Sequence, residues 1–373
     1  MPSQSKNLEA TAAIARGPSE PLTFEQVTLE PPRKDEVLVK VVASGVCHTD
    51  LVCQQQDLPV PLPIVLGHEG AGIVIETGDA VEGLSPGDHV VLSFNSCGGC
   101  PSCKGQLPSY CYSFVENNLS GCRGDGSGTM VQSGEHVNAN FFGQSSFSTM
   151  ALTNVRNTVK VSKSLPLETL APLGCGIQTG AGTVFNSLPV TASDSLAIFG
   201  GGAVGLSALM AAKIVGAGPI VVIEPLADRR ALARELGADH VIDPFGVDDV
   251  VEEIKKAVTA VDFSLEMTGV PDVIRQCVDV LKPLGTCALV GAAPAGAEVH
   301  LNIMDILIPG RKIVGIVEGD AEPGTFIPRL IEYYEEGIFP FDRLIHFFPF
   351  EALNEAVEAQ KSGQSIKPVV RME

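Results

Sequence analysis

Gly200-Gly201-Gly202-Ala203-Val204-Gly205 follows the apolar run 195–199 and decides the fold of the second half of this 373-residue chain. The run predicts a strand, and the glycines have the Gly-x-Gly-x-x-Gly spacing of a turn that binds a dinucleotide and opens a helix. Gly200 permits the tight turn, Gly202 lets the backbone approach a pyrophosphate, and Gly205 lets helix and strand pack closely. The helix, which begins near Ala203 and Val204 and runs to about residue 215, offers free N–H groups to phosphates.

An acidic residue supports this interpretation, because a glycine motif alone also marks ordinary turns. The next strand, 219–223, ends at Glu224, 19 residues after Gly205, close to the ~20 expected for a carboxylate that binds ribose hydroxyls. Such a carboxylate repels a 2′-phosphate, so the sequence predicts NAD rather than NADP. Arg229 and Arg230 follow on a predicted helix and complicate this prediction, because a basic residue there could instead approach a phosphate. A solvated helix face is the other interpretation of the pair, and we expect one of them, assigned as Arg229, to touch the ribose.

Strands and helices alternate after this motif. We expect helices over 227–236, 248–259 and 271–282, and strands over 240–243, 261–266, 285–291 and 312–317. Alternating βα units imply a parallel sheet with helices on both faces, so residues 177–320 are predicted to form a doubly wound cofactor-binding domain.

The preceding residues predict a different architecture. Short strands separated by Gly and Pro, among them 36–42, 72–76 and 88–92, favour an antiparallel, barrel-like domain, and 36–42 alternates as a half-buried strand should. The last ~50 residues, with helices near 324–336 and 350–361 and a closing strand, are expected to return to it. The predicted domain therefore comprises residues 1–176 and 321–373.

Three separated residues predict an open metal site. Cys47 lies in Gly45-Val46-Cys47-His48-Thr49-Asp50, His68 in Leu66-Gly67-His68-Glu69-Gly70, and Cys175 in Leu173-Gly174-Cys175-Gly176. Two thiolates and one imidazole leave one position of a tetrahedral zinc ion open for substrate, which is the catalytic arrangement.

A second cluster predicts a closed metal site. Cys97, Cys100, Cys103 and Cys111 follow one another at spacings of three, three and eight residues. Four thiolates satisfy a tetrahedral zinc ion completely, so we expect a structural role, with an iron–sulfur cluster as the alternative.

Composition excludes several classes of partner. The net charge of −19 argues against nucleic acid and against an anionic membrane surface. The apolar run 196–212 contains four glycines and a serine, which disfavours a membrane span. The N-terminal residues show no signal-peptide pattern, so we expect a reducing, cytoplasmic location in which the cysteines bind metal. Four cysteines outside the two clusters are interpreted as small buried hydrophobic residues: Cys53, Cys122, Cys277 and Cys287.

Together these motifs resemble the zinc-dependent alcohol dehydrogenases of the medium-chain dehydrogenase/reductase superfamily. Gly67-His68-Glu69-x-x-Gly72-x5-Gly78-x2-Val81 is similar to the zinc signature of that family, and the four-cysteine spacing also matches. The resemblance implies a GroES-like β-rich catalytic domain joined to a Rossmann domain. Within the family, three stretches resemble the aryl- and benzyl-alcohol dehydrogenases: 47–52, 141–147 and 366–369.

The resemblance implies a role for each matching residue. Zinc ions, two per chain, are bound by Cys47, His68 and Cys175 (catalytic) and by the four clustered cysteines (structural). Thr49 takes the proton of the substrate hydroxyl, while Asp50 and Glu69 orient the metal ligands. The expected cofactor contacts are His48 and Lys367 at the pyrophosphate and Thr179 and Val290 near the nicotinamide.

One position departs from the family pattern. Many members carry a proton-relay histidine five residues after the first zinc cysteine, where this chain has Val52. The final step of the relay must then use His48, a water molecule or another exit. The aryl-alcohol branch often lacks this histidine too, so the departure does not argue against activity.

The implied reaction interconverts a primary aromatic or allylic alcohol and its aldehyde, with zinc as Lewis acid and NAD as hydride acceptor. Possible pocket residues are Phe94, Leu119, Phe141 and Phe142, with core packing as the other interpretation of the phenylalanines. Alternatives are an enzyme for a bulkier specialised alcohol, a polyol dehydrogenase, a zinc-free reductase of the superfamily, or a non-catalytic protein that retains the fold. A homodimer or homotetramer is expected, with the strand 312–317 pairing across a two-fold axis as in relatives.

Overall fold

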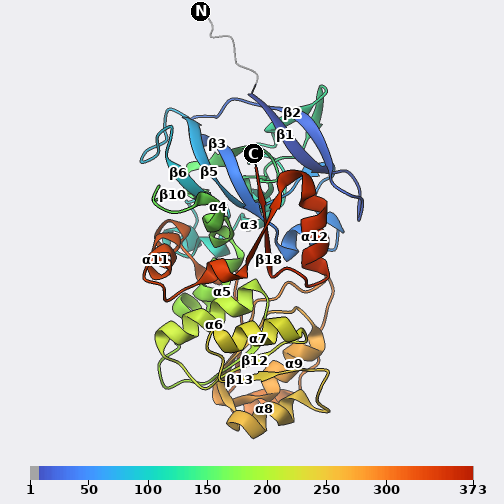
Figure 1. Cartoon of the computed structure of the whole chain (residues 1–373), viewed down its shortest axis with the longest axis vertical. Helices are drawn as coiled ribbons and strands as arrows, with labels where there is room; N and C mark the ends of the chain where they lie inside the picture. The colour runs from blue at the N-terminus through green and yellow to red at the C-terminus, as the bar shows by residue number, and fades with distance from the viewer. Residues whose placement is uncertain (1–7, 373) are drawn as a thin grey trace, which may run out of the picture. The chain divides into compact units, whose positions relative to one another are not determined.

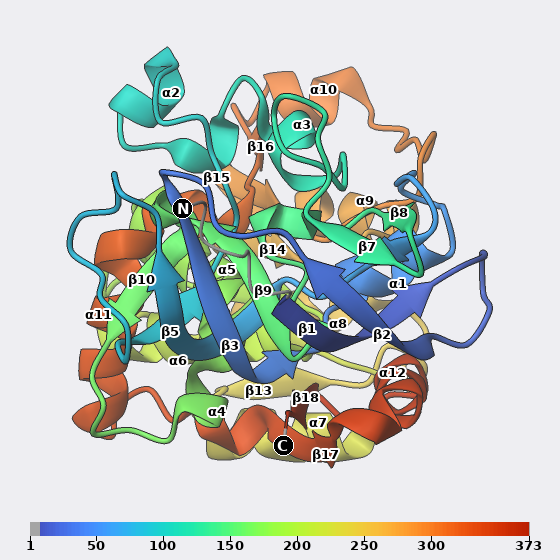
Figure 2. The same cartoon turned by 90° about the horizontal axis from the view of Figure 1, so that it is seen from above.

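The structure is a computed structural model and describes residues 8–372 (Figures 1 and 2). Their contacts divide the chain into two compact units. The first holds the described residues up to Cys175, together with Glu322–Ile331 and those from Asp342 onward. The second holds Gly176–Ala321 and Glu332–Phe341.

Two largely antiparallel sheets form the frame of the first unit. The smaller has the order β4 (Ile64–Val65), β1 (Leu8–Ala15), β2 (Thr23–Leu29), β7 (Met130–Gln132), β8 (Glu135–Val137). The larger has the order β10 (Thr158–Val161), β6 (His89–Leu92), β5 (Glu69–Thr77), β3 (Glu36–Gly45), β18 (Lys367–Arg371), β17 (Ile345–Pro349), and β9 (Met150–Asn154) also pairs with β3. The pairing of β18 with β3 brings the end of the chain onto this sheet.

Strand β3 is more deeply buried than its alternating sequence predicts. It pairs with β5, β9 and β18, and Val37, Leu38 and Val39 are all fully buried. The predicted alternation holds at Lys40, which is exposed, but not at Glu36, which is buried. The Glu36 carboxylate accepts two hydrogen bonds from the buried Arg123, at 2.6 and 2.9 Å.

Short helices connect the strands of the first unit. They are α1 (His48–Gln54), α2 (Pro101–Lys104), α3 (Phe114–Asn118), α4 (Leu167–Leu170) and α12 (Leu353–Lys361), and α11 (Pro323–Glu335) begins here and ends in the second unit. Only α11 and α12 were predicted as helices; the others, at four to seven residues, are too short to show a helical period.

The second unit is a parallel six-stranded sheet, which confirms the predicted fold. Its order is β13 (His240–Ile242), β12 (Ile220–Ile223), β11 (Leu196–Phe199), β14 (Val261–Glu266), β15 (Leu281–Leu289), β16 (Lys312–Gly315). This is the doubly wound order in which the first strand lies in the middle and a ligand binds beyond the carboxyl ends of the strands. The helices are α5 (Gly176–Gly182), α6 (Ala203–Val215), α7 (Ala227–Glu235), α8 (Val250–Val258), α9 (Pro271–Asp279) and α10 (Ile303–Leu307).

Two details of the second unit differ from the sequence prediction. Strand β15 begins at Leu281 rather than 285, because Leu281 pairs with Val261 before an irregularity in the register. Helix α10 was not predicted; Asn302 caps it by accepting a hydrogen bond from the Met304 N–H at 2.9 Å. Among residues 8–372 no helix is both long and apolar enough to cross a membrane.

Candidate metal centres and cofactor turn

Cys47, His68 and Cys175 converge in the first unit. One potential ligand atom from each lies within 4.8 Å of the others. Cys47 immediately precedes α1, His68 immediately precedes β5, and Cys175 follows a 3-10 turn, Ala171–Gly174. The side chains of His68 and Cys175 are buried and that of Cys47 is partly buried, so a metal held here would be largely shielded from solvent.

Asp50 orients two of these three residues. Its Oδ2 accepts a hydrogen bond from the Cys47 N–H at 2.9 Å, and its Oδ1 lies 2.9 Å from His68 Nδ1. The same Oδ1 accepts a hydrogen bond from the Gly67 N–H at 3.0 Å. A carboxylate beside Nδ1 fixes the proton on that nitrogen and leaves the lone pair of Nε2 for a metal. Asp50 is thus buried and bonds to the His68 imidazole and to the backbone of Cys47 and Gly67.

The donor set fits zinc. His68 Nε2 is buried and has no hydrogen-bond partner among the described residues, which is costly for a polar atom unless it binds an ion. The pKa of the Cys47 thiol lies well below its ordinary value, because a hydrogen bond from Cys175 and the positive charge of Lys367 favour the thiolate over the opposing effect of burial. Two soft sulfur donors and one imidazole suit a zinc ion with one open position.

Thr49 lies beside the open site. Its Oγ1 is 3.8 Å from Cys47 Sγ, and it occupies the first turn of α1 with His48. The His48 side chain is exposed, and Val52, where many family members carry the relay histidine, is half-buried on the same helix.

Lys367, for which a contact with the cofactor pyrophosphate was predicted, pairs with Glu69 within the chain. Its side chain is 2% exposed, with Nζ 2.8 and 2.9 Å from the two carboxylate oxygens of Glu69. Nζ also donates to the Val46 carbonyl at 3.2 Å. Burial raises the pKa of Glu69 to about 7 against the opposing charge of Lys367. A Cβ at position 45 would collide with the Glu69 carboxylate, so Gly45 makes room for the pair.

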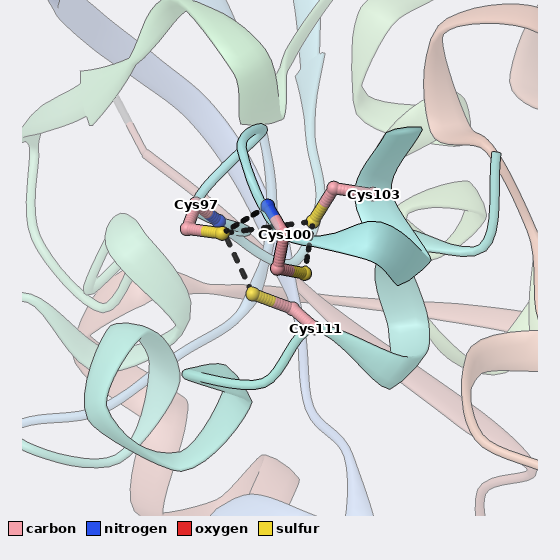
Figure 3. A group of neighbouring side chains, drawn as sticks. All are labelled: Cys97, Cys100, Cys103 and Cys111. Carbon is pink, nitrogen blue, oxygen red and sulfur yellow. Dashed lines mark hydrogen bonds between the residues drawn. The ribbon is translucent and has the colours of Figure 1, made fainter. Parts of the chain in front are cut away.

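The four clustered cysteines form a local knot around α2 (Figure 3). Their sulfur atoms all lie within 4.8 Å of one another and point inward. The N–H groups of Gly99 and Cys100 donate to Cys97 Sγ at 3.4 and 3.3 Å and lower the pKa of that thiol. Such N–H donors stabilise thiolates, so the knot offers a complete tetrahedral set with no open position.

An aromatic cluster packs against His68. The ring of Phe142 stacks on the imidazole, with centroids 4.5 Å apart and planes 28° apart, and Phe141 meets it edge-on at 5.5 Å. Both are buried members of the main core, as is Phe94, and Leu119 packs against that core. The structure thus supports the core-packing interpretation of these phenylalanines.

The glycine turn of the second unit has the predicted local geometry. Gly200 has a φ of +108°, a conformation that favours glycine, and a Cβ on Gly205 would collide with the Gly200 carbonyl oxygen. Gly202 caps α6. Glu224, 3% exposed, accepts hydrogen bonds from the N–H groups of Gly201 at 2.6 Å and Leu226 at 2.9 Å. The carboxylate therefore lies against the glycine turn.

The other predicted cofactor contacts lie at several places in this unit. The Arg229 guanidinium is directed towards Gly202, with Nη1 3.9 Å from the place of a Cβ there. Arg230 instead donates to the Glu224 carbonyl at 2.8 Å and pairs with Asp243. Thr179 is on α5, where its Oγ1 donates to Glu318 at 3.4 Å, and Val290 follows the carboxyl end of β15.

Comparisons with known proteins agree with this geometry. The chain matches the family models for the alcohol dehydrogenase GroES-like domain over residues 33–163 and for the zinc-binding dehydrogenase over residues 203–335. It is 49% identical over 365 residues to the geraniol dehydrogenase of Castellaniella defragrans, covering 97% of this chain and 98% of that protein. The chain belongs to the zinc-dependent alcohol dehydrogenases of the medium-chain dehydrogenase/reductase superfamily.

Solved structures place this alcohol dehydrogenase among close relatives. The alcohol dehydrogenase zinc-binding domain protein from Burkholderia ambifaria is 47% identical, with a TM-score of 0.96 over 99% of this chain and 100% of that chain. The benzyl alcohol dehydrogenase from Acinetobacter calcoaceticus is 44% identical, with a TM-score of 0.94 over 98% and 99%. The protein is accordingly an oxidoreductase that acts on CH–OH groups and uses zinc and a nicotinamide cofactor.

Sequence reasoning missed Gln144. This residue is fully buried and donates a hydrogen bond to the His68 carbonyl at 3.0 Å. Its amide side chain, between Phe142 and Phe147, was the available signal, since a buried amide requires partners. The hydrogen-bond partners of Gln144 are distant in the sequence, so its residue type alone could not identify them.

Proposed function

We propose that this alcohol dehydrogenase interconverts primary aromatic or allylic alcohols and their aldehydes, with NAD as cofactor and with the catalytic zinc on Cys47, His68 and Cys175. The observation that carries the proposal is the buried His68 Nε2, free of protein partners among the described residues and grouped with two cysteine sulfurs. The relatives support the substrate class. Geraniol is a primary allylic alcohol and benzyl alcohol a primary aromatic one, and both place an unsaturated carbon next to the reacting carbon.

The residues around the open site have separate tasks. A zinc ion there supplies Lewis acidity to the alcohol oxygen. Thr49, beside Cys47 in the first turn of α1, relays the hydroxyl proton: its Oγ1 accepts that proton as its own hydroxyl proton is passed on towards solvent. Asp50 orients the imidazole of His68 and the backbone of Cys47 relative to each other. Glu69 and Lys367 form a buried ion pair. The exposed His48 is the residue of this group best placed to exchange a proton with solvent, since Val52 cannot.

The cofactor binds at the glycine turn of the second unit. The nicotinamide supplies the hydride acceptor. Gly200, Gly202 and Gly205, with the first N–H groups of α6, receive the pyrophosphate, and Glu224 accepts the hydrogen bonds of the adenosine ribose. Arg229, directed towards Gly202, contacts the cofactor on the same side. Thr179 and Val290 are assigned to the nicotinamide end.

The four-cysteine knot binds a second zinc ion with a structural role. Its donor set is complete, so no position remains for substrate. We therefore expect two zinc ions per chain. Only the zinc ion of the open site should be required directly for catalysis.

Zinc analysis combined with NADH formation tests the proposal. Two zinc ions per chain and faster turnover of benzyl alcohol and geraniol than of a short aliphatic alcohol or a polyol are expected. Two zinc ions without turnover of any of these would favour the alternative of a bulkier, specialised alcohol. A wild-type chain that neither retains zinc at the open site nor binds NAD would favour a non-catalytic member of the superfamily.

Replacing Glu224 by Ala tests the cofactor preference. The ratio of kcat/KM for NAD to that for NADP should fall at least about tenfold, because the ribose loses its acceptor and the repulsion of a 2′-phosphate disappears. Steady-state kinetics with both cofactors measure the ratio. The matched control is Glu235→Ala, which removes another carboxylate of the second unit, at the end of α7. An unchanged ratio would remove Glu224 from the ribose site.

We also propose that the enzyme is a homo-oligomer, with a second copy bound at α10 and β16. Strand β16 pairs with β15 and is an edge strand of the sheet among the described strands. Next to it in sequence, α10 and the following residue expose large apolar side chains: Ile303 78%, Met304 51%, Leu307 67% and Ile308 76%. Such a patch beside an edge strand favours self-association.

Sedimentation analysis of wild type and Leu307→Asp tests this surface. The wild type should sediment as a dimer or tetramer, and the variant should shift towards the monomer, because a desolvated carboxylate opposes an apolar interface. Phe245→Asp, at a residue that is 87% exposed elsewhere on the second unit, is the control. A variant that associates as the wild type does would exclude α10 from the interface.

A further inference from the structure

Residues 141–147 run alongside residues 65–70 and bond to them repeatedly. Ser145 Oγ donates to the Val65 carbonyl at 2.6 Å. The N–H groups of Phe147 and Ser146 donate to the carbonyls of Leu66 and Gly67 at 3.0 and 2.8 Å. The contact is therefore continuous along the segment that leads to His68.

Gln144 extends this contact on both sides of His68. Its Nε2 donates to the carbonyls of His68 and Ser93, each at 3.0 Å, and its Oε1 accepts from the Gly70 N–H at 3.0 Å. The side chain is fully buried, so no water competes for these bonds. A single amide thus ties the backbone of the metal ligand to the strand end at Ser93.

Phe142 restrains the imidazole itself. Its ring stacks on one face of His68, and Phe141 approaches edge-on. Phe142 has a φ of 50° and a ψ of 33°, in the left-handed region that residues other than glycine rarely adopt. The surrounding bonds hold this conformation, and it turns the ring onto the imidazole.

We infer that residues 141–147 position the metal ligand His68. Within this segment, Gln144 and Phe142 affect the metal site by fixing the orientation of His68. The inference rests on the proposed assignment of His68 to the catalytic zinc. With Nδ1 held by Asp50, the backbone by Gln144 and the ring face by Phe142, the imidazole keeps one orientation, and Nε2 is directed to the metal. Neither residue touches the reacting atoms in this assignment; both set the geometry and the lifetime of the metal–imidazole bond.

The test measures the metal rather than turnover. Wild type, Gln144→Ala and Phe142→Leu are prepared with cobalt in the open site and zinc in the knot, and the visible and near-ultraviolet cobalt bands are recorded. In a second measurement, a chelator removes the open-site zinc from the all-zinc enzymes. We expect shifted cobalt bands and about tenfold or greater acceleration of zinc release in both variants, since orienting groups around a ligand typically change metal affinity about 10–100-fold.

Asn354→Ala is the matched control. Asn354 is also an amide that clamps a backbone, accepting from the Leu22 N–H at 2.9 Å and donating to the Leu22 carbonyl at 3.0 Å, but it contacts neither metal site. Its loss should lower the melting temperature and leave the cobalt bands and the zinc release unchanged. If Gln144→Ala does not fold, the isosteric Gln144→Glu, which keeps an acceptor for Gly70 and loses both donated bonds, replaces it.

The outcomes separate this inference from the proposed function. Wild-type cobalt bands and wild-type zinc release in the Gln144 and Phe142 variants would overturn the positioning role and leave the zinc assignment intact. A wild-type enzyme that binds metal only in the knot would overturn the assignment of His68 itself, and the inference with it.

Discussion

His68→Ala is expected to lose the catalytic zinc and to lower kcat/KM by at least about a thousandfold. The zinc ion is worth several kcal/mol of charge stabilisation, and each 1.36 kcal/mol is about tenfold in rate. The fold should persist, because the site is open and its residues are held by other contacts, such as Asp50 to the backbone N–H groups of Cys47 and Gly67. Zinc content per chain, circular dichroism and NADH formation with benzyl alcohol measure the three properties.

Two further variants calibrate the His68 result. Asp50→Asn removes the charge beside Nδ1 but not the ligand, so it should weaken zinc binding about 10–100-fold rather than abolish it. His136→Ala replaces an exposed histidine of the same unit and should change nothing. Retention of full zinc and activity by His68→Ala, or loss of soluble protein in that variant alone, would contradict an open catalytic site.

Cys100→Ala is expected to destabilise the enzyme without direct damage to the open site. With three sulfurs left, the knot should lose its zinc, and the binding free energy of a structural zinc ion contributes to folding. A loss of about 4 kcal/mol corresponds to a fall in melting temperature of roughly 10 °C for a domain of this size. Differential scanning calorimetry and zinc analysis follow the change.

Cys122→Ala is the control for the knot. Cys122 is a half-buried thiol outside both clusters, so its loss removes a sulfur atom but no predicted ligand. It should keep both zinc ions and the melting temperature of the wild type. Normal thermal stability of Cys100→Ala in the absence of the knot zinc would refute a structural role.

The parts of the fold that can be predicted from the sequence are those determined by residues close together in the chain. The glycines at 200, 202 and 205 have strict conformational requirements, and the structure shows the same turn, the same helix and the parallel sheet around them. The cysteine spacing predicts the knot because its ligands are close in the chain. Membership of the alcohol dehydrogenase family is confirmed, while the role of each site residue stays a prediction for the experiments above.

The parts that the sequence does not predict depend on distant partners. Lys367 pairs with Glu69, 298 residues away, and the structure takes its ammonium out of solvent. The bonds of Gln144 to residues 68, 70 and 93 span 51 to 76 residues. No local pattern distinguishes a buried amide that clamps a metal ligand from one that packs in a core, because only the tertiary fold selects its partners.

The two cysteine-containing sites differ in how much chain each needs. The knot uses residues 97–111, a stretch short enough to close at little cost in chain entropy, whereas the open site needs residues 47, 68 and 175. On a ribosome, the knot ligands are complete once Cys111 has been made, while half of the span from Cys47 to Cys175 is still to come, and Cys175 is the last ligand. The knot ligands lie within one short stretch, so the knot should take its ion during synthesis, whereas the open site can form only after Cys175 has been made. Cells short of zinc would then accumulate folded chains that are filled in the knot and inactive.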